Sequence, residues 1–289
     1  GWHDWYIAAN IKNKKNLNNH LLTGINPAGV PNKLGEIIFP FEYNKISQLE
    51  EIVKKNKDLG IIKMEVSRNV KPQKNFLEQV RKISNKNNII LIFDECTSGF
   101  RETFGGLHKK YKVIPDIAIF GKALGNGYAI NAIIGKSKVM KFAEKSFISS
   151  TFWTERIGPT AALKTLDVMK KVESWKIISK QGKKIKKGWK KLAEKYDLGI
   201  EVEGLDSLCS FKFLSTKHTE YKTIISQEML KKGYLASNSV YVCIKHNDSI
   251  INEYLSDLDD VFKLIKECEN GRNIDSILEL RKCEEGFQR

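Results

Sequence analysis

The sequence predicts an α/β protein, with a mostly parallel sheet in a large domain followed by a smaller α+β domain. Two short apolar runs, Ile89–Phe93 and Ile117–Phe120, are rich in isoleucine and do not alternate with polar residues. Such runs are typical of strands buried on both faces of a parallel sheet. Helical patterns precede and separate the strand candidates, as crossover helices do. We expect a large domain over residues 1–165, a connecting helix over 166–195 and a small domain over 196–289.

The expected elements of the large domain follow one another in the order helix, strand, helix, strand. Residues 10–35 are rich in Asn, Lys, Gly and Pro and predict a loop. The elements expected after this loop are a helix over 46–57 with Ser47 as its N-cap, a strand over 60–64 ending at Glu65, a helix over 76–84, strands over 89–93, 117–120 and 129–134, and a short helix over 139–144.

A long helix is expected to lead into the small domain. Pro159 suits a first helical turn, and the apolar spacing from Ala161 to Val172 predicts that the helix continues to about Lys195. Beyond it, the patterns predict short strands over 199–203, 208–214 and 240–244 and helices over 221–232 and 251–267.

Composition excludes several classes of protein. The chain of 289 residues is long enough for a sizeable core, and 41% of its residues are hydrophobic. No apolar run approaches the ~18 residues of a membrane span, and the first residues do not resemble a signal peptide. Five cysteines without a CxxC spacing argue against a disulfide framework or a zinc site. We expect a soluble protein of the reducing cytoplasm, without a bound metal.

The formal charge of +15 is a weak argument for nucleic-acid binding. The chain has 42 lysines but only seven arginines, and 21 asparagines accompany them, which indicates compositional drift. The densest basic run, Lys180–Lys191, has helical spacing and is interpreted as a solvated helix face. We therefore expect no nucleic-acid partner, although a basic nucleic-acid-associated protein, or a cofactor-free protein with a structural role, stays an alternative.

An acid and an amine follow the two buried strand candidates. Asp94 ends the first, and Lys122 comes just after Gly121 at the end of the second. Ligands of open α/β sheets bind outside the carboxyl ends of the strands, so both groups are placed to meet one ligand. Burial of Lys122 would favour its neutral amine and make it a nucleophile toward carbonyls. The alternative is an ordinary solvated lysine.

The acidic pair Asp94–Glu95 after IILIF also resembles a Walker B strand of an ATPase. That interpretation requires a phosphate loop of the form GxxxxGK[ST]. The only GKS, at 135–137, has Ile130 in place of the first glycine and follows the acid instead of preceding it. The ATPase interpretation is therefore weak.

Taken together, the motifs resemble those of the class III pyridoxal-phosphate (PLP) aminotransferases, and in particular the glutamate-1-semialdehyde aminomutase-like members. The segment FDECTSGFR is followed by GKALGNG, with 28 residues from Asp94 to Lys122. Further similar segments occur in family order and cover nearly the whole chain: GVPNKLGEIIFPFEYN, SSTFWTERIGPTAAL, KKGYLASNSVYVCIKHN and DSILELRKCEEGFQR. The resemblance implies the fold type I of PLP-dependent transferases and the cofactor pyridoxal 5'-phosphate.

The resemblance also assigns roles to individual residues. Lys122 would form the internal aldimine with the cofactor and carry the proton between Cα and C4′. Asp94 would pair with the protonated pyridine nitrogen and keep the ring cationic. Cys96, on the same face of an extended segment, would lie against the ring, and Thr97 would lie near the ring hydroxyl. Thr151 would reach the phosphate of a neighbouring subunit's cofactor, which implies a homodimer with shared sites.

Other residues are weaker candidates. Glu65 matches a family glutamate that we interpret as structural support. Arg101 and Arg156 are candidates for substrate or interface contacts, with surface salt bridges as the alternative. His3 and His246 are more often structural residues than site residues.

The resemblance implies that the family's phosphate-binding loop and ring-stacking aromatic residue would lie upstream of Gly1. We expect an active parent enzyme that transfers an amino group between a small-molecule donor and a carbonyl acceptor, and a chain that by itself binds the cofactor poorly or not at all. An intramolecular aminomutase is the alternative within the same chemistry. The identity of the donor and the acceptor stays open.

Overall fold

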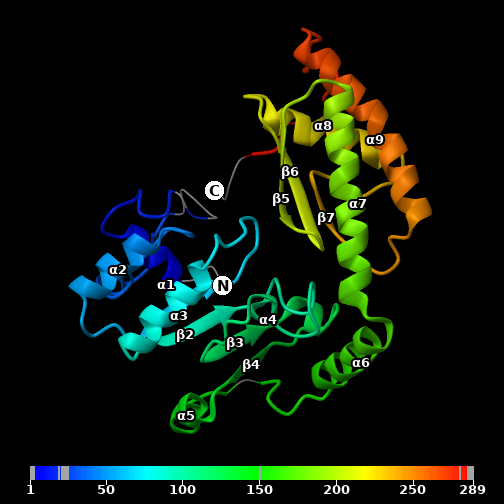
Figure 1. Cartoon of the computed structure of the whole chain (residues 1–289). Helices are drawn as coiled ribbons and strands as arrows, with labels where there is room; N and C mark the ends of the chain where they lie inside the picture. Colours follow the sequence, from blue (N-terminus) through cyan, green and yellow to red (C-terminus); the bar gives the residue numbers. More distant parts are fainter. Residues whose placement is uncertain (1–3, 19, 21–25, 150, 280, 285–289) are drawn as a thin grey trace.

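The computed structural model describes residues 4–18, 20, 26–149, 151–279 and 281–284. Within these residues the strands form two sheets, one of four strands and one of three. Figure 1 shows the first sheet in the lower half of the molecule and the second in the upper half, with the long helix α7 rising from one to the other. The predicted α/β class is confirmed.

The larger sheet is parallel over three of its four strands. Its order is β1-β2-β3-β4, and β4 runs antiparallel to β3. The strands are β1 (Ile61–Glu65), β2 (Ile90–Asp94), β3 (Ile117–Phe120) and β4 (Ala132–Gly135). In the register, Asp94 is paired with Glu65 on one side and with Ile119 on the other. The carboxyl ends of the three parallel strands therefore meet at one edge of the sheet.

Short and medium helices accompany this sheet. They are α1 (Asp4–Ile7), α2 (Ile46–Lys55), α3 (Phe76–Lys86), α4 (His108–Tyr111), α5 (Ser137–Met140) and α6 (Ile157–Val172), with 3-10 turns η1 (Ala8–Asn10), η2 (Asn32–Glu36), η3 (Lys122–Leu124) and η4 (Lys141–Lys145). The predicted N-cap Ser47 is wrong, because α2 already begins at Ile46. The side chain of Gln48 instead accepts the backbone N–H of Glu42, which orients the chain entering α2.

In the described part of the chain, one face of the larger sheet is buried and the other is only partly covered, which corrects the prediction that its strands are buried on both faces. Leu91 and Phe93 of β2 are fully buried in a core that includes residues of α2 and α3. On the opposite face, Ile61 and Ile133 are both more than half exposed. The apolar runs that suggested two buried faces therefore alternate between a covered and an open face in the described part of the chain.

The single helix predicted from Pro159 to about Lys195 is two helices. Helix α6 ends at Val172, Glu173 adopts a left-handed conformation (φ 48°, ψ 46°), and α7 (Ser174–Lys195) starts in a new direction. Left-handed residues commonly end helices, but usually they are glycine or asparagine. The sequence therefore carried no strong signal for this break. Pro159 lies in the first turn of α6, as predicted.

The smaller sheet packs against three helices. Its strands β5 (Ile200–Leu205), β6 (Leu208–Phe213) and β7 (Ser239–Tyr241) are antiparallel, and the helices are α7, α8 (His218–Lys231) and α9 (Asp248–Glu269). Trp189 of α7 and Phe211 of β6 are almost completely buried in this core, with ring centroids 4.7 Å apart. The apolar face of α7 thus belongs to the second core, while lysines of the basic run, including Lys183, Lys187 and Lys190, are exposed.

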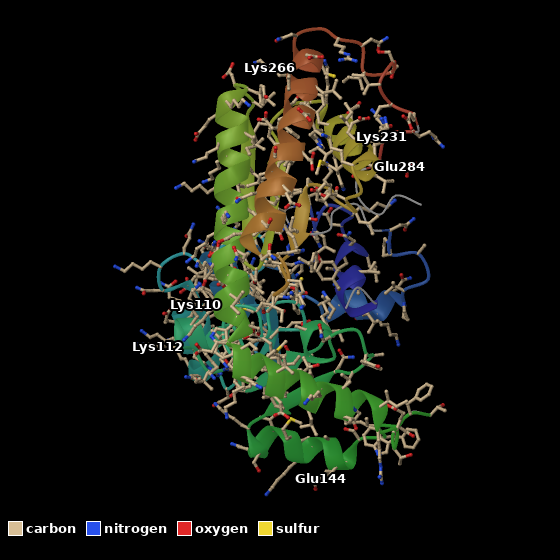
Figure 2. The ribbon with its side chains drawn as sticks, turned by 90° about the vertical axis from the view of Figure 1, so that its right-hand side faces the viewer. Lys110, Lys112, Glu144, Lys231, Lys266 and Glu284 are labelled. Carbon is tan, nitrogen blue, oxygen red and sulfur yellow. The ribbon has the colours of Figure 1, made fainter. Side chains whose placement is uncertain are left out.

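The turn between β5 and β6 attaches the smaller sheet to the larger one. The buried carboxylate of Glu102 accepts the backbone N–H of Asp206 at 2.8 Å and forms an ion pair with Lys110 at 2.7 Å. The backbone N–H of Gly204 donates to the carbonyl of Asn69. Figure 2 shows Lys110 beside the lower part of α7, at this junction.

Among the described helices, none is long and apolar enough to cross a membrane.

Candidate active site

The ends of β1, β2 and β3 place four polar side chains along one edge of the larger sheet. Glu65 and Asp94 are the last residues of β1 and β2, and Lys122 follows β3 by two residues. Thr97 lies three residues after Asp94, in the turn that leaves β2. This arrangement follows from the parallel register, as the sequence predicted for the two strand ends.

Lys122 is held by both its backbone and its side chain. Its φ of 41° lies in the left-handed region, which is uncommon for a residue with a side chain. Its Nζ donates a hydrogen bond to Oγ1 of the buried Thr97 at 2.6 Å. Such unfavourable backbone conformations concentrate at functional sites. The predicted burial of Lys122 is wrong for this chain, because the residue is exposed at the open end of the sheet.

Asp94 is an anchored carboxylate. Its Oδ1 accepts the backbone N–H of Cys96 at 3.1 Å, and its Oδ2 forms an ion pair with Lys63 at 2.9 Å. Burial raises the pKa of Asp94, but the hydrogen bond and charge of Lys63, together with the hydrogen bond from the N–H of Cys96, bring the pKa below its usual value. The side chain is therefore ionised and fixed in orientation at neutral pH.

Glu65 has a different environment from Asp94. Burial raises the pKa of Glu65 above its usual value; Arg68, with an Nη1 3.9 Å from Oε1, opposes this effect, and the neighbouring carboxylate of Asp94 adds to it. The charge of Lys122 also acts on Glu65, which indicates that these groups share one electrostatic environment. The position agrees with the supporting role that the sequence suggested, and that role stays a prediction.

A tight turn follows Asp94, where the sequence had suggested an extended segment. The N–H of Cys96 bonds back to Asp94, and the N–H of Gly99 bonds to the carbonyl of Glu95. Asp side chains favour such local bonds to the backbone two residues on. The turn directs Cys96 toward Gly121: a Cβ built on Gly121 would lie only 2.7 Å from Sγ of Cys96. The absence of a side chain at Gly121 thus allows the close approach of the two strand ends.

The fully buried side chain of Glu95 stabilises this turn. Its carboxylate accepts hydrogen bonds from the hydroxyl of Ser98 and from the backbone N–H groups of Leu107 and His108. Nδ1 of His108 lies 2.7 Å from the same carboxylate. A buried carboxylate is tolerated because its oxygens are satisfied in this way. Glu95 therefore fixes the turn that carries Cys96 and Thr97.

Arg101 connects this turn to the smaller sheet. Its Nε donates to the carbonyl of Thr97 at 2.8 Å, and its guanidinium lies 5.4 Å from the ring centroid of Tyr241 in β7. Burial lowers the pKa of Arg101 from its usual value. These contacts differ from the surface salt bridge that the sequence left open as the alternative.

Within the part of the chain that the structure describes, no contact brings the remaining candidates to these strand ends. Thr151 and Arg156 are both exposed. Thr151 lies in the loop that precedes α6, and Arg156 is the residue just before the helix. Nδ1 of His246 accepts the backbone N–H of Cys243, which is a structural role in a turn. His3 lies outside the described residues. The predicted site roles of these residues stay predictions.

Sequence reasoning missed Lys63, the ion-pair partner of Asp94. The only signal was a lysine inside the apolar run of β1, between Ile62 and Met64. It also missed the buried partners of Glu95, because residues thirteen positions apart meet there only through the fold.

Within the described residues, no group of three or more His, Cys, Asp or Glu side chains is arranged to hold a metal ion.

Comparison with known proteins identifies the family. The model of the family "Aminotransferase class-III" matches residues 43–250, which include both strand ends described above. The chain belongs to the class III aminotransferases. The 3-aminobutyryl-CoA aminotransferase of Cloacimonas acidaminovorans is 32% identical to this class III aminotransferase over 266 residues, which cover 86% of this chain and 59% of that protein. The glutamate-1-semialdehyde 2,1-aminomutase of Persephonella marina is 27% identical, with coverages of 81% and 60%.

Solved structures show the same fold. The PLP internal aldimine form of the FumI protein of Sphingopyxis sp. MTA144 superposes with a TM-score of 0.79 at 19% identity, over 89% of this chain and 64% of that one. A transaminase with PLP bound superposes with a TM-score of 0.76 at 18% identity, over 87% of this chain and 63% of that one. The predicted fold type I is confirmed. The chain spans about 60% of the length of these relatives.

Proposed function

We propose that this class III aminotransferase takes part in the transfer of an amino group from a small-molecule donor to a carbonyl acceptor with pyridoxal 5'-phosphate. The observation that carries the proposal is the position of Lys122 and Asp94 at the carboxyl ends of two neighbouring parallel strands. An amine and an ionised carboxylate at one sheet edge suit a ligand with an aldehyde at one position and a basic nitrogen at another.

The side chains of Lys122 and Asp94 at the sheet edge suit two of the polar groups of pyridoxal phosphate. The exposed amine of Lys122 is accessible to an aldehyde, and the oriented carboxylate of Asp94 suits a protonated ring nitrogen. When bound, the cofactor supplies an electrophilic carbon for amino groups and a cationic ring that draws electrons from the substrate. For its phosphate, we propose Thr151 of a second subunit, in line with the family resemblance.

The residues of this chain have distinct tasks in the proposed reaction. The amine of Lys122 would bind the cofactor, and it would then take the proton from Cα of the donor and deliver it to C4′. Asp94 would hold the ring nitrogen in its protonated form, and Cys96 would lie against the ring. Thr97 orients Nζ of Lys122 through the 2.6 Å hydrogen bond. Glu95 fixes the turn on which Cys96 and Thr97 stand.

An aminomutase is a second candidate, because the relatives include glutamate-1-semialdehyde 2,1-aminomutases. Both reactions begin with the transfer of an amino group to the cofactor. They differ in the product, since a mutase returns the amino group to another carbon of the same molecule. Incubation with single amino compounds, followed by product analysis, separates a keto product from an isomer of the substrate.

We propose a homodimer that forms through residues 142–163. This segment exposes a series of large apolar side chains, of which Phe147 and Phe152 are 99% and 76% exposed. The other members are Phe142, Ile148, Trp153, Ile157 and Leu163. Exposed apolar surface of this extent marks interaction sites. Glu144 of this segment lies at the opposite end of the molecule from Lys266, as Figure 2 shows, so the interface would leave the smaller sheet free.

A cytoplasmic location agrees with the cysteines, which are all free in the structure.

Sedimentation of the Phe152→Ser/Trp153→Ser double variant tests the proposed dimer. The variant should be monomeric, whereas Leu235→Ser, which alters an apolar residue that is 99% exposed and lies outside the segment, should sediment like the unmodified chain. A monomeric unmodified chain would contradict the proposal.

Covalent capture of the cofactor tests the proposed function. The chain is incubated with pyridoxal phosphate, reduced with borohydride and digested, and the modified lysine is found by mass spectrometry. We expect the modification on Lys122, and its loss in Lys122→Ala but not in Lys112→Ala, which alters an exposed lysine elsewhere on the larger domain. Modification spread over many surface lysines, with no preference for Lys122, would contradict the proposal.

A further inference from the structure

The carboxylate of Asp94, which we propose to bind the ring nitrogen of the cofactor, already forms an ion pair with a lysine. Nζ of Lys63 lies 2.9 Å from Oδ2 of Asp94. Lys63 is a central residue of β1, its register partner is Ile92 of β2, and both point to the open face of the sheet. The ammonium group thus reaches along this face to the strand end where Asp94 lies.

We propose that Lys63 is a positioning residue that shares Asp94 with the ring nitrogen of the cofactor and weakens the hold of Asp94 on that nitrogen. This inference rests on the proposed function. It assigns to Lys63 a part in setting the affinity for the cofactor and the charge of its ring, which no motif in the sequence indicated.

The geometry allows both cations to share the carboxylate. Oδ1 accepts one hydrogen bond from the N–H of Cys96, and Oδ2 accepts one from Lys63. An ionised carboxylate has about four acceptor positions on its two oxygens, so one more donor fits. Lys63 therefore does not block the site.

The electrostatic effect of sharing is unfavourable for the ring nitrogen. The negative charge of Asp94 stabilises a protonated nitrogen, while the positive charge of Lys63 at the same carboxylate opposes it. The side chain of Lys63 is 47% exposed and that of Asp94 19%, so solvent screens the effect only in part. Removing the ammonium group should leave the negative charge of Asp94 unopposed at the ring nitrogen.

The substitution Lys63→Met tests the inference, because it removes the charge but retains an unbranched side chain among the isoleucines of the sheet face. The affinity for pyridoxal phosphate is measured by absorbance titration over a wide concentration range, in the 289-residue chain and in the variant. The same titration is made with a pyridoxal phosphate analogue that has carbon in place of the ring nitrogen. We expect Lys63→Met to bind pyridoxal phosphate about three- to tenfold more tightly.

The carbon analogue should bind equally to both proteins, because it has no nitrogen to compete for Asp94. Lys136→Met is the matched control: Lys136 forms a comparable ion pair with Asp116, at 2.7 Å, beside the start of β3 at the opposite end of the sheet. Lys136→Met should bind both pyridoxal phosphate and the carbon analogue as tightly as the unmodified chain does. Circular dichroism and thermal unfolding show whether each variant is folded, and replacing an exposed ion-pair lysine should leave the fold intact.

Unchanged or weaker binding of pyridoxal phosphate by folded Lys63→Met would overturn the inference, and so would equal tightening for cofactor and analogue. Failure of the proposed function has a different signature. In that case no protein would show modification of Lys122 after borohydride reduction, whatever residue stands at position 63.

Discussion

Nζ of Lys122 donates a 2.6 Å hydrogen bond to Oγ1 of Thr97, and this bond joins the ends of two neighbouring parallel strands. Lys122 reaches Thr97 from a left-handed backbone conformation, while Thr97 stands on a turn that the buried carboxylate of Glu95 stabilises. The amine is thus exposed to a ligand but fixed in direction.

This bond predicts a role for Thr97 in the reaction of Lys122. Thr97→Val keeps the shape of the side chain and removes the acceptor, and the loss of one hydrogen bond corresponds to about 0.5–1.5 kcal/mol. We expect borohydride-trapped modification of Lys122 by pyridoxal phosphate to slow several-fold, as followed by mass spectrometry over time. Thr97→Ser should retain the rate of the unmodified chain. A valine variant as fast as the serine variant would show that the bond does not orient the amine.

The close approach of Gly121 to Cys96 predicts a steric limit at the site. Gly121→Ala would place a Cβ 2.7 Å from Sγ of Cys96 and against the side chain of Asn131, so we expect a loss of about 1–3 kcal/mol in the free energy of unfolding. Urea denaturation measures this loss. Gly60→Ala, at the start of β1, is the control, since its Cβ would meet no atom within 4 Å. Equal stability of the two variants would contradict the packing argument.

The contact of Arg101 with Tyr241 predicts that the turn of the site is supported by the smaller sheet. Tyr241→Leu removes the aromatic ring under the guanidinium, and we expect a loss of about 0.5–1 kcal/mol in stability. Arg101→Met should lose more, because it also removes the hydrogen bond to the carbonyl of Thr97. Thermal unfolding of the two single variants and the double variant measures the coupling. Strictly additive effects would show that the two residues do not interact.

The ion pair of Glu220 and Lys282 predicts a pH dependence of stability. The hydrogen bond from Lys282 lowers the pKa of Glu220 from 4.5 to about 2. Because the folded pKa lies below the unfolded value, the pair stabilises the fold above pH 4.5 and the effect is lost as the pH falls toward 2. We expect Lys282→Met to lower the stability of the fold only slightly at neutral pH, because Lys282 is exposed and solvent screens the ion pair.

Urea denaturation of this variant at several pH values checks the prediction. The difference from the unmodified chain should shrink below pH 4.5, where Glu220 begins to take up a proton in the unfolded chain. Lys222→Met, which alters an exposed lysine of the same helix α8, should show no such trend. A constant difference across the acid range would contradict the assigned ion pair.

The sequence by itself determined the class of the fold, the elements around the site, and the placement of Asp94 and Lys122 at neighbouring strand ends. Short runs of isoleucine before a polar residue are a local signal, and the carboxyl ends of parallel strands lie at one edge. The same local signals could not show that one sheet face is open, because residues such as Ile61 look alike whether covered or exposed. The left-handed break at Glu173 was equally invisible.

Only the tertiary structure decided the partners of the charged groups. The ion pair of Lys63 with Asp94 and the hydrogen bonds of Glu95 join residues that are distant in the sequence. These contacts depend on strand register and on the path of a turn, and a pattern of residue types along the chain records neither. For this reason the sequence pointed to the two ends of the proposed ligand, while the cation that shares Asp94 became visible only in the folded chain.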